Sequence, residues 1–185
     1  DAVTRQVIEM VNHRFADHPG STDQFDLPVT RDQALILLND FIENRLPRFG
    51  DYQDAMWAGS DFLYHSRLSH AMNLHLLSAH EVVHAATTAW ASGHSPIAAI
   101  EGFVRQVLGW REYVRGVYWL KMPDYAALNE LQCDPEQNVP PFFWDGKTEM
   151  ACVADAMRLL LQTAYAHHIQ RLMVLGLYAQ LLGVH

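Results

Sequence analysis

Apolar residues recur at helical spacing along most of this chain. Between positions 101 and 125 the apolar positions are three or four residues apart, at Phe103, Val107, Trp110, Val114 and the pair Val117 and Tyr118. This spacing places the side chains on one face of a single amphipathic helix. No run alternates in the manner of a series of strands, and no repeat or low-complexity segment is present. The pattern therefore predicts an all-α protein.

Capping signals predict where the other helices begin. A short amphipathic helix is expected over 1–15, followed by a break at 18–22 and a loop over 23–29. Thr30 with Gln33 forms a capping box before a helix over 34–46, which Pro47, Gly50 and Asp51 would end. Ser78 with Glu81 forms a second capping box, before a helix that reaches about position 91.

The second half of the chain is predicted to contain two long helices. Ser95 is the expected N-cap of the central helix, with Pro96 at its first position, and Pro123 ends it. A long loop over 128–146 carries the aromatic cluster Phe142-Phe143-Trp144, and Thr148 is the expected cap of one last helix over roughly 150–182. We divide the chain into an N-terminal helix and linker, 1–29, and a helical domain, 30–185.

Composition narrows the class of protein. The 185 residues fit one domain, and half of them are apolar. No apolar run is long enough to span a bilayer, so no membrane partner is expected. A net charge of -8 argues against bulk electrostatic binding of nucleic acid, although it allows a local basic patch. Two cysteines make no disulfide framework, so a reducing cytoplasm is expected. The chain begins with Asp1 and is expected to be a piece of a longer protein.

Arg111 lies beside the apolar stripe of the central helix, where its charge needs a partner. From the residues alone the favoured partner is a carboxylate, Glu112 or Glu101, and the alternative is a bound phosphate. Ser66-Arg67-Leu68-Ser69 before a helix has the composition of an anion site, because hydroxyls, free backbone N–H groups and a guanidinium bind phosphate. An ordinary helix cap with a surface arginine explains the same residues.

Three further groups could carry chemistry. His80-Glu81-Val82-Val83-His84 matches a zinc-protease pattern, but Glu81 is already the capping-box carboxylate and a third ligand is not evident, which favours a solvated histidine pair. His168 and Arg171 share one face of the last helix, which indicates a cavity or else a core histidine. Cys152 near the start of that helix is a buried thiol or a thiolate ligand of a metal or cluster.

These motifs resemble the FAD-binding domain of the photolyase/cryptochrome family in order and spacing, and more narrowly its bacterial iron–sulfur branch. The similarity extends over nearly all of the chain from Thr30 onward. It rests on Ser66–Ser69 and on the long stretches Pro47-Arg-Phe-Gly-Asp-Tyr-Gln-Asp-Ala-Met56, Gly109-Trp-Arg-Glu-Tyr-Val-Arg-Gly116, Tyr118-Trp-Leu-Lys-Met-Pro-Asp-Tyr125 and Ala164-Tyr-Ala-His-His-Ile-Gln-Arg-Leu-Met173. The resemblance implies that the chain is part of a helical FAD domain, without the antenna domain and the C-terminal end.

The resemblance also implies a flavin site. The cofactor-binding residues would be Tyr52, His65, Ser66, Arg67, Leu68, Ser69, Gln106, Arg111 and Arg171. Trp110 would face the lesion, and His168 would donate a proton to it while reduced FAD supplies an electron. A histidine at position 168 favours the (6-4) photoproduct as the lesion. Leu172 stands where animal (6-4) enzymes have a second histidine, which leaves that role unfilled.

Further expectations concern the other cofactors and partners. Cys152 matches the first of four cysteines that hold a [4Fe–4S] cluster in this branch, with the others beyond residue 185. An antenna chromophore would belong to the absent N-terminal domain. UV-damaged DNA would meet a local basic patch formed by Arg105, Arg115 and Lys121, and the full-length protein is expected to be a monomer. A cryptochrome-like photosensor is the alternative on the same scaffold, and a zinc peptidase is a distant one.

Overall fold

A computed structural model describes residues 1–184, which form helices and loops and contain no β-strand beyond two isolated bridges. The predicted all-α class is therefore confirmed. The chain divides into two compact units. The first unit consists of Asp1–Asp26, Met56–Asp61 and the chain from Asn129 onward, and the second consists of Leu27–Ala55 and Phe62–Leu128. No helix of the described residues is long and apolar enough to cross a membrane.

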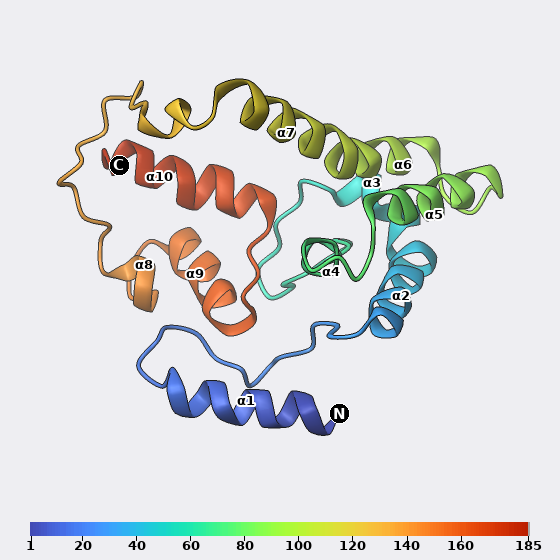
Figure 1. Ribbon diagram of the computed structural model, residues 1–185, viewed down its shortest axis with the longest axis horizontal. Coiled ribbons are helices and arrows are strands. Elements are labelled where there is room, and N and C mark those ends of the chain that lie inside the picture. The colour runs from blue at the N-terminus through green and yellow to red at the C-terminus, as the bar shows by residue number, and fades with distance from the viewer. Residues whose placement is uncertain (185) are drawn as a thin grey trace. The chain divides into compact units, whose positions relative to one another are not determined.

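The second unit has its core between α3 and α6, which lie side by side (Figure 1). Its helices are α2 (Arg31–Asp40), α3 (Leu46–Tyr52), α4 (Ser69–Asn73), α5 (Ala79–Ala91), α6 (Ile97–Val104) and α7 (Trp110–Lys121). Phe41, Phe49 and Phe103 fill the centre, with ring centroids 4.7 Å apart for Phe41 and Phe103 and 5.7 Å for Phe49 and Phe103. Gly50 allows the close approach, since a Cβ there would lie 3.0 Å from the backbone nitrogen of Ala99.

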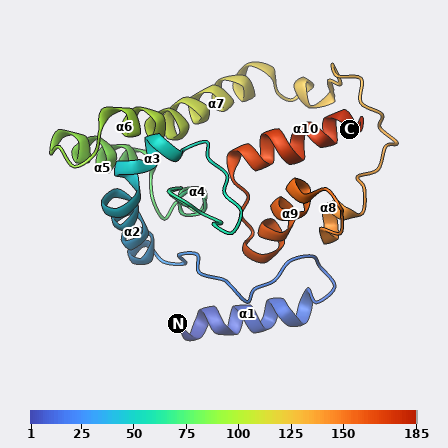
Figure 2. The same cartoon turned by 180° about the vertical axis from the view of Figure 1, so that it is seen from behind.

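The first unit contains α1 (Ala2–Arg14), α8 (Phe142–Asp145), α9 (Ala151–Thr163) and α10 (Leu177–Leu181). Seen from behind, α8 lies beside α9 (Figure 2). Buried Val153, Ala156 and Met157 of α9 pack with Leu175, which lies in the helical turns that precede α10. This small core fixes the helix that carries the residues predicted to act on the lesion.

Both predicted capping boxes are present. The Thr30 hydroxyl accepts from the backbone N–H of Gln33, and the Ser78 hydroxyl accepts from that of Glu81. Three expected helix ends are wrong. Pro47 lies in the first turn of α3 rather than after a helix, Ser95 is buried while Pro96 caps α6, and Thr148 accepts from the N–H of Met150, which is the N-cap of α9.

The helix expected over 101–125 is present as a continuous helical stretch from Ile97 to Lys121, but its expected buried face is wrong. The helical path from α6 into α7 contains a turn of π-helix at Arg105–Gly109, and α7 itself has no buried residue. A π-turn places one additional residue in the helix and so rotates every later side chain relative to the earlier ones. The stripe therefore enters the core at Phe103 and Val107 but is exposed beyond, with Val114 58% exposed. Pro123 follows the end of the helix, as expected.

The last helix is broken where the sequence predicts continuity. α9 ends at Thr163, Ala164 adopts a left-handed conformation with φ 55°, and residues 165–167 are not helical. A new helix starts at His168, passes through a π-helical segment at Gln170–Gly176 and continues as α10. His168 therefore stands at the start of a helix and not in the interior of one.

Candidate functional site

The second unit contains an open hollow of about 680 Å³ along the π-helical turn between α6 and α7. It is lined by Gln53, Gly102, Arg105, Gln106, Trp110 and Tyr113, among others. Its volume lies in the range of small-molecule and cofactor sites. Because Arg105 and Gln106 belong to the π-turn and Trp110 follows it, the inserted residue of that turn sets how these side chains face the hollow.

Two aromatic rings form apolar walls of this hollow. The rings of Trp110 and Tyr113 stand almost perpendicular, at 86°, with centroids 6.1 Å apart, and Trp110 is half exposed. Gln53 supplies an amide, and its Oε1 lies only 2.6 Å from the position a Cβ of residue 102 would take, so Gly102 is required for its placement. Stacking surfaces beside amide groups suit a flat heteroaromatic ligand, either a flavin or a nucleobase.

The Ser66–Ser69 segment has an unusual local conformation in the same unit. Arg67 has a positive φ of 57°, and its guanidinium carbon lies 3.9 Å from the ring centroid of Phe62. The Ser66 hydroxyl accepts from the N–H of Leu68 at 3.4 Å, Leu68 is buried, and Ser69 begins the five-residue helix α4. The alternative interpretation of this segment as an ordinary helix cap is wrong, because no side chain caps α4.

Arg111 has a different partner from the one the sequence favours. Its guanidinium donates to the side-chain oxygen of Asn73 at 3.4 Å, and the residue makes no ion pair among residues 1–184. The two expected carboxylates bind other arginines, Glu101 with Arg105 at 3.4 Å and Glu112 with Arg115 at 3.3 Å. Asn73 is the last residue of α4, so this hydrogen bond brings Arg111 next to the helix that starts at Ser69.

The remaining flavin candidates of the second unit are fixed by arginines. Arg48 donates to the Tyr52 hydroxyl at 2.9 Å, and the Tyr52 ring stacks on Tyr64 with centroids 4.9 Å apart. Arg45 donates to the carbonyl of His65 at 2.8 Å. The structure therefore brings Tyr52, the residues around His65 and the hollow into one packed unit.

His168 and Arg171 belong to the first unit, where both side chains are exposed. They are separated by three positions at the start of the helix, as the spacing predicts, and Leu172 beside them is 52% exposed. The preceding His167 is instead buried, at 4% exposure, together with Gln170. The sequence pattern assigned no role to His167. It places His167 inside a continuous helix, because no glycine or proline marks the break at Ala164.

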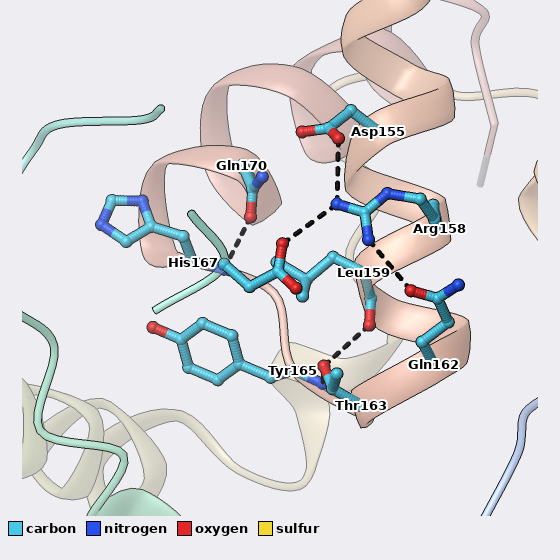
Figure 3. A network of polar contacts seen from close by, with 9 residues as sticks. Asp155, Arg158, Leu159, Gln162, Thr163, Tyr165, His167 and Gln170 are labelled. Atoms are coloured by element: carbon cyan, nitrogen blue, oxygen red, sulfur yellow. Dashed lines mark hydrogen bonds and ion pairs between the residues drawn. The ribbon is translucent and has the colours of Figure 1, made fainter. Parts of the chain in front are cut away.

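A polar network that the sequence did not predict joins the 56–61 segment to α9 (Figure 3). Arg158 donates from Nη2 to Asp61 at 3.0 Å and to Asp155 at 3.1 Å, and from Nη1 to Gln162 at 2.9 Å. The hydrogen bonds to the two carboxylates raise the pKa of the arginine. Ion pairs between distant segments leave no local pattern, which is why this one was not foreseen.

The zinc-protease pattern does not form a metal site. His80 and His84 are both exposed, with parallel rings whose centroids are 6.2 Å apart, but the part of the chain that is described contains no cluster of three metal-ligating side chains. Glu81 accepts from the Ser78 backbone at 2.9 Å and is paired with Arg31. The hydrogen bonds from Arg31 and then Ser78 lower the pKa of Glu81 to about 2, far below that of a general base at neutral pH.

Cys152 is the second residue of α9 and is exposed, so the expected buried thiol is wrong. Cys133 is partly buried. A [4Fe–4S] cluster takes four thiolates and the chain has two cysteines, so its own residues do not complete such a site. An exposed thiol near the first turn of a thirteen-residue helix is suited to supply one ligand.

Both units are helical, and the hollow beside Trp110 in the second unit has the size and lining to receive a flat, polar-edged group. No family model matches the sequence. The chain is 45% identical, over 184 residues and its full length, to a (6-4) photolyase from Agrobacterium fabrum. It spans 36% of that protein's length. The whole chain is thus similar to part of a protein of the photolyase family, as its motifs predict.

Proposed function

We propose that this chain is part of the FAD-binding domain of a light-driven DNA repair lyase that acts on the (6-4) photoproduct. The observation that carries the proposal is the 45% identity to a (6-4) photolyase, which extends over the whole length of this chain. A histidine at position 168, the residue type that the family resemblance associates with (6-4) repair, points to the same lesion.

Most of the flavin-binding residues that we propose belong to the second unit. Arg111 and the Ser66–Ser69 segment are neighbours through Asn73 and offer a guanidinium, hydroxyls and backbone groups to a phosphate or to the edge of a flavin ring. Tyr52, His65 and Gln106 complete the set in the second unit, and Arg171 is its member in the first. When bound and reduced, FAD supplies an electron to the lesion on excitation by light.

The hollow would receive the lesion after it has turned out of the duplex. Trp110 offers an exposed indole face for stacking, and Gln53 and Gln106 offer amides to the polar edges of the bases. The volume of the hollow, about 680 Å³, lies in the range of sites that bind small molecules. Trp110 would thus orient the lesion by stacking.

His168 would hold and donate the proton. Its imidazole is exposed at a helix start, where it is accessible to a ligand, and histidine exchanges protons near neutral pH. Arg171, one turn later, places a permanent positive charge beside the site and stabilises negative charge there.

DNA phosphates would be contacted by the π-turn and α7. Arg105, Arg115 and Lys121 are exposed on this segment in a chain whose net charge is -8. Phosphate contacts of this kind give affinity without sequence preference, as repair of lesions in any sequence requires. Cys152 is proposed as one ligand of an iron–sulfur cluster completed by cysteines outside this chain.

The test is a repair assay with the full-length protein that contains this chain. The reduced, flavin-loaded protein is illuminated with blue light in the presence of an oligonucleotide with one (6-4) lesion, and a matched oligonucleotide with a cyclobutane dimer is the control. We expect the protein to repair the (6-4) lesion to intact bases and to leave the cyclobutane dimer unrepaired. A flavoprotein that repairs neither lesion would support the photosensor reading, and zinc without flavin would overturn both.

A further inference from the structure

The two histidines at 167 and 168 have opposite environments, although they are adjacent in the sequence. His167 is 4% exposed and His168 is exposed. The chain reaches them through the left-handed turn at Ala164 and the non-helical residues 165–167. A helix that starts after such a break has free backbone N–H groups in its first turn, and these need acceptors.

His167 supplies one of these acceptors with its side chain. Its Nδ1 accepts a hydrogen bond from the backbone N–H of Ile169 at 3.1 Å, and its carbonyl accepts the first intrahelical bond from Arg171 at 2.9 Å. Gln170 completes the arrangement in the other direction, because its Oε1 accepts from the backbone N–H of His167 at 3.0 Å (Figure 3).

The arrangement resembles a capping box in which an imidazole replaces the usual hydroxyl and bonds to the N–H of the second helical residue, Ile169, instead of the third. His167 is the N-cap residue, His168 and Ile169 are the first two helical residues, and Gln170 is the third, where glutamine is favoured. His167 and Gln170 are both buried, with 4% and 9% exposure, so water cannot readily take the place of either acceptor.

The capping bond also fixes the state of the ring. A nitrogen that accepts from Ile169 cannot carry a proton, so the imidazole of His167 is neutral and holds its proton on Nε2. A protonated His167 would lose this bond and leave the first turn without an acceptor. The ring is therefore unsuited to deliver a proton while the helix start is intact.

We propose that His167 is a positioning residue that, with Gln170, sets the helix start so that His168 and Arg171 stand in the correct place for the repair reaction. The proposal rests on the proposed function in its account of His168. Its structural core, a neutral histidine cap, stands without that function. The two histidines have different roles: His167 fixes the backbone at the start of the helix, and His168 exchanges the proton.

The test compares cap-competent with cap-deficient variants of the full-length flavoprotein. His167→Asn keeps a side-chain oxygen that can accept from the Ile169 N–H, and His167→Ala removes the acceptor. Gln170→Glu and Gln170→Ala form the matched pair at the other end of the box. Three quantities are measured: the amide hydrogen exchange of residues 167–171, the light-dependent repair rate and the affinity for damaged DNA.

The two alanine variants are expected to exchange the Ile169 and His167 amides about tenfold faster, respectively, as the loss of a cap predicts. The repair rate of the alanine variants should fall by a similar factor, while their DNA affinity changes less than threefold. His167→Asn and Gln170→Glu should restore both the slow amide exchange and the repair rate. If His167→Asn exchanges as fast as His167→Ala, the cap is refuted. If Asn restores slow exchange but not repair, His167 takes part in the chemistry and the positioning role is refuted.

The exchange measurement separates this inference from the proposed function. A wild-type protein that repairs no lesion would contradict the function, while the amide protection of Ile169 would still confirm or refute the cap. If a His167 variant fails to bind flavin, Gln170→Ala is compared with Gln170→Glu instead. Gln170→Ala removes the hydrogen bond from the His167 N–H and leaves both histidines unchanged.

Discussion

The Nη2 of Arg158 on α9 lies 3.0 Å from the Oδ1 of Asp61, a residue 97 positions earlier in the chain. Asp61 ends the short segment that returns to the first unit between two stretches of the second. The side chains are 41% and 31% exposed, so the pair is only partly shielded from solvent. This hydrogen bond holds the 56–61 segment against α9, whose second residue is Cys152.

Removal of this arginine should loosen the segment that it holds. Arg158→Leu is expected to cost about 1 kcal/mol, since charged hydrogen bonds at partly exposed sites contribute on this scale. Amide exchange of residues 56–61 should accelerate accordingly. Arg115→Leu, which breaks a more exposed pair with Glu112, is the matched control and should change little. Equal exchange rates in the two variants would contradict the role of Arg158.

The Glu81 carboxylate should titrate far below an ordinary glutamate. Its pKa is lowered from 4.5 to about 2 by Arg31 and then by Ser78. Because the folded pKa is the lower one, the stabilisation of the α5 start is fully present above about pH 4.5 and is lost as the pH falls towards 2. An NMR titration of the Glu81 carboxyl carbon measures this directly, and Arg31→Met should raise the value. A midpoint near 4.5 in the wild type would refute the network.

The hollow beside Trp110 offers a clean steric test. A Cβ at Gly109 meets no atom within 4 Å and lies on the lining of the hollow, so Gly109→Leu should fold and obstruct the site. Gly116→Leu, equally unobstructed but away from the hollow, is its control. Trp110→Ala should weaken binding of a (6-4) oligonucleotide by about 10- to 100-fold, the worth of a stacked base. Unchanged affinity in Gly109→Leu and Trp110→Ala would place the lesion elsewhere.

Cys152 should be required for iron in the full-length protein. Cys152→Ala removes one of four thiolates and is expected to lower bound iron and labile sulfide to a small fraction of the wild-type content. Cys133→Ala removes a thiol that the proposal does not use and should retain both. Iron analysis with the visible absorption spectrum checks this, and equal iron in the two variants would exclude Cys152 as a ligand.

Local signals in the sequence predicted much of the fold. Thr30 with Gln33 and Ser78 with Glu81 are correct because a capping box depends only on residues three positions apart. Ser95 failed for the opposite reason, since its side chain is buried and the chain enters α6 one residue later. Tertiary packing decided that boundary.

The π-turns and the break at Ala164 could not be predicted from periodicity. Arg105–Gly109 and Gln170–Gly176 each end on a glycine, but a glycine within a helical pattern does not by itself distinguish a π-turn from α-helix. Each segment carries residues of the proposed site. A pattern that assumes 3.6 residues per turn therefore placed Trp110 and Val114 on a buried face. The motifs supply the proposed site residues, and the environments of several of these residues depend on the irregular turns.

The most direct test of the central claim is the light-driven repair of a (6-4) oligonucleotide by the reduced full-length protein and its His168→Ala variant. The proton donated by His168 is expected to contribute about 100-fold or more to the rate, as general acids do. Repair by the wild type and a loss of this size in the variant are expected, with flavin content and DNA affinity unchanged. Repair at the wild-type rate by His168→Ala would contradict the claim.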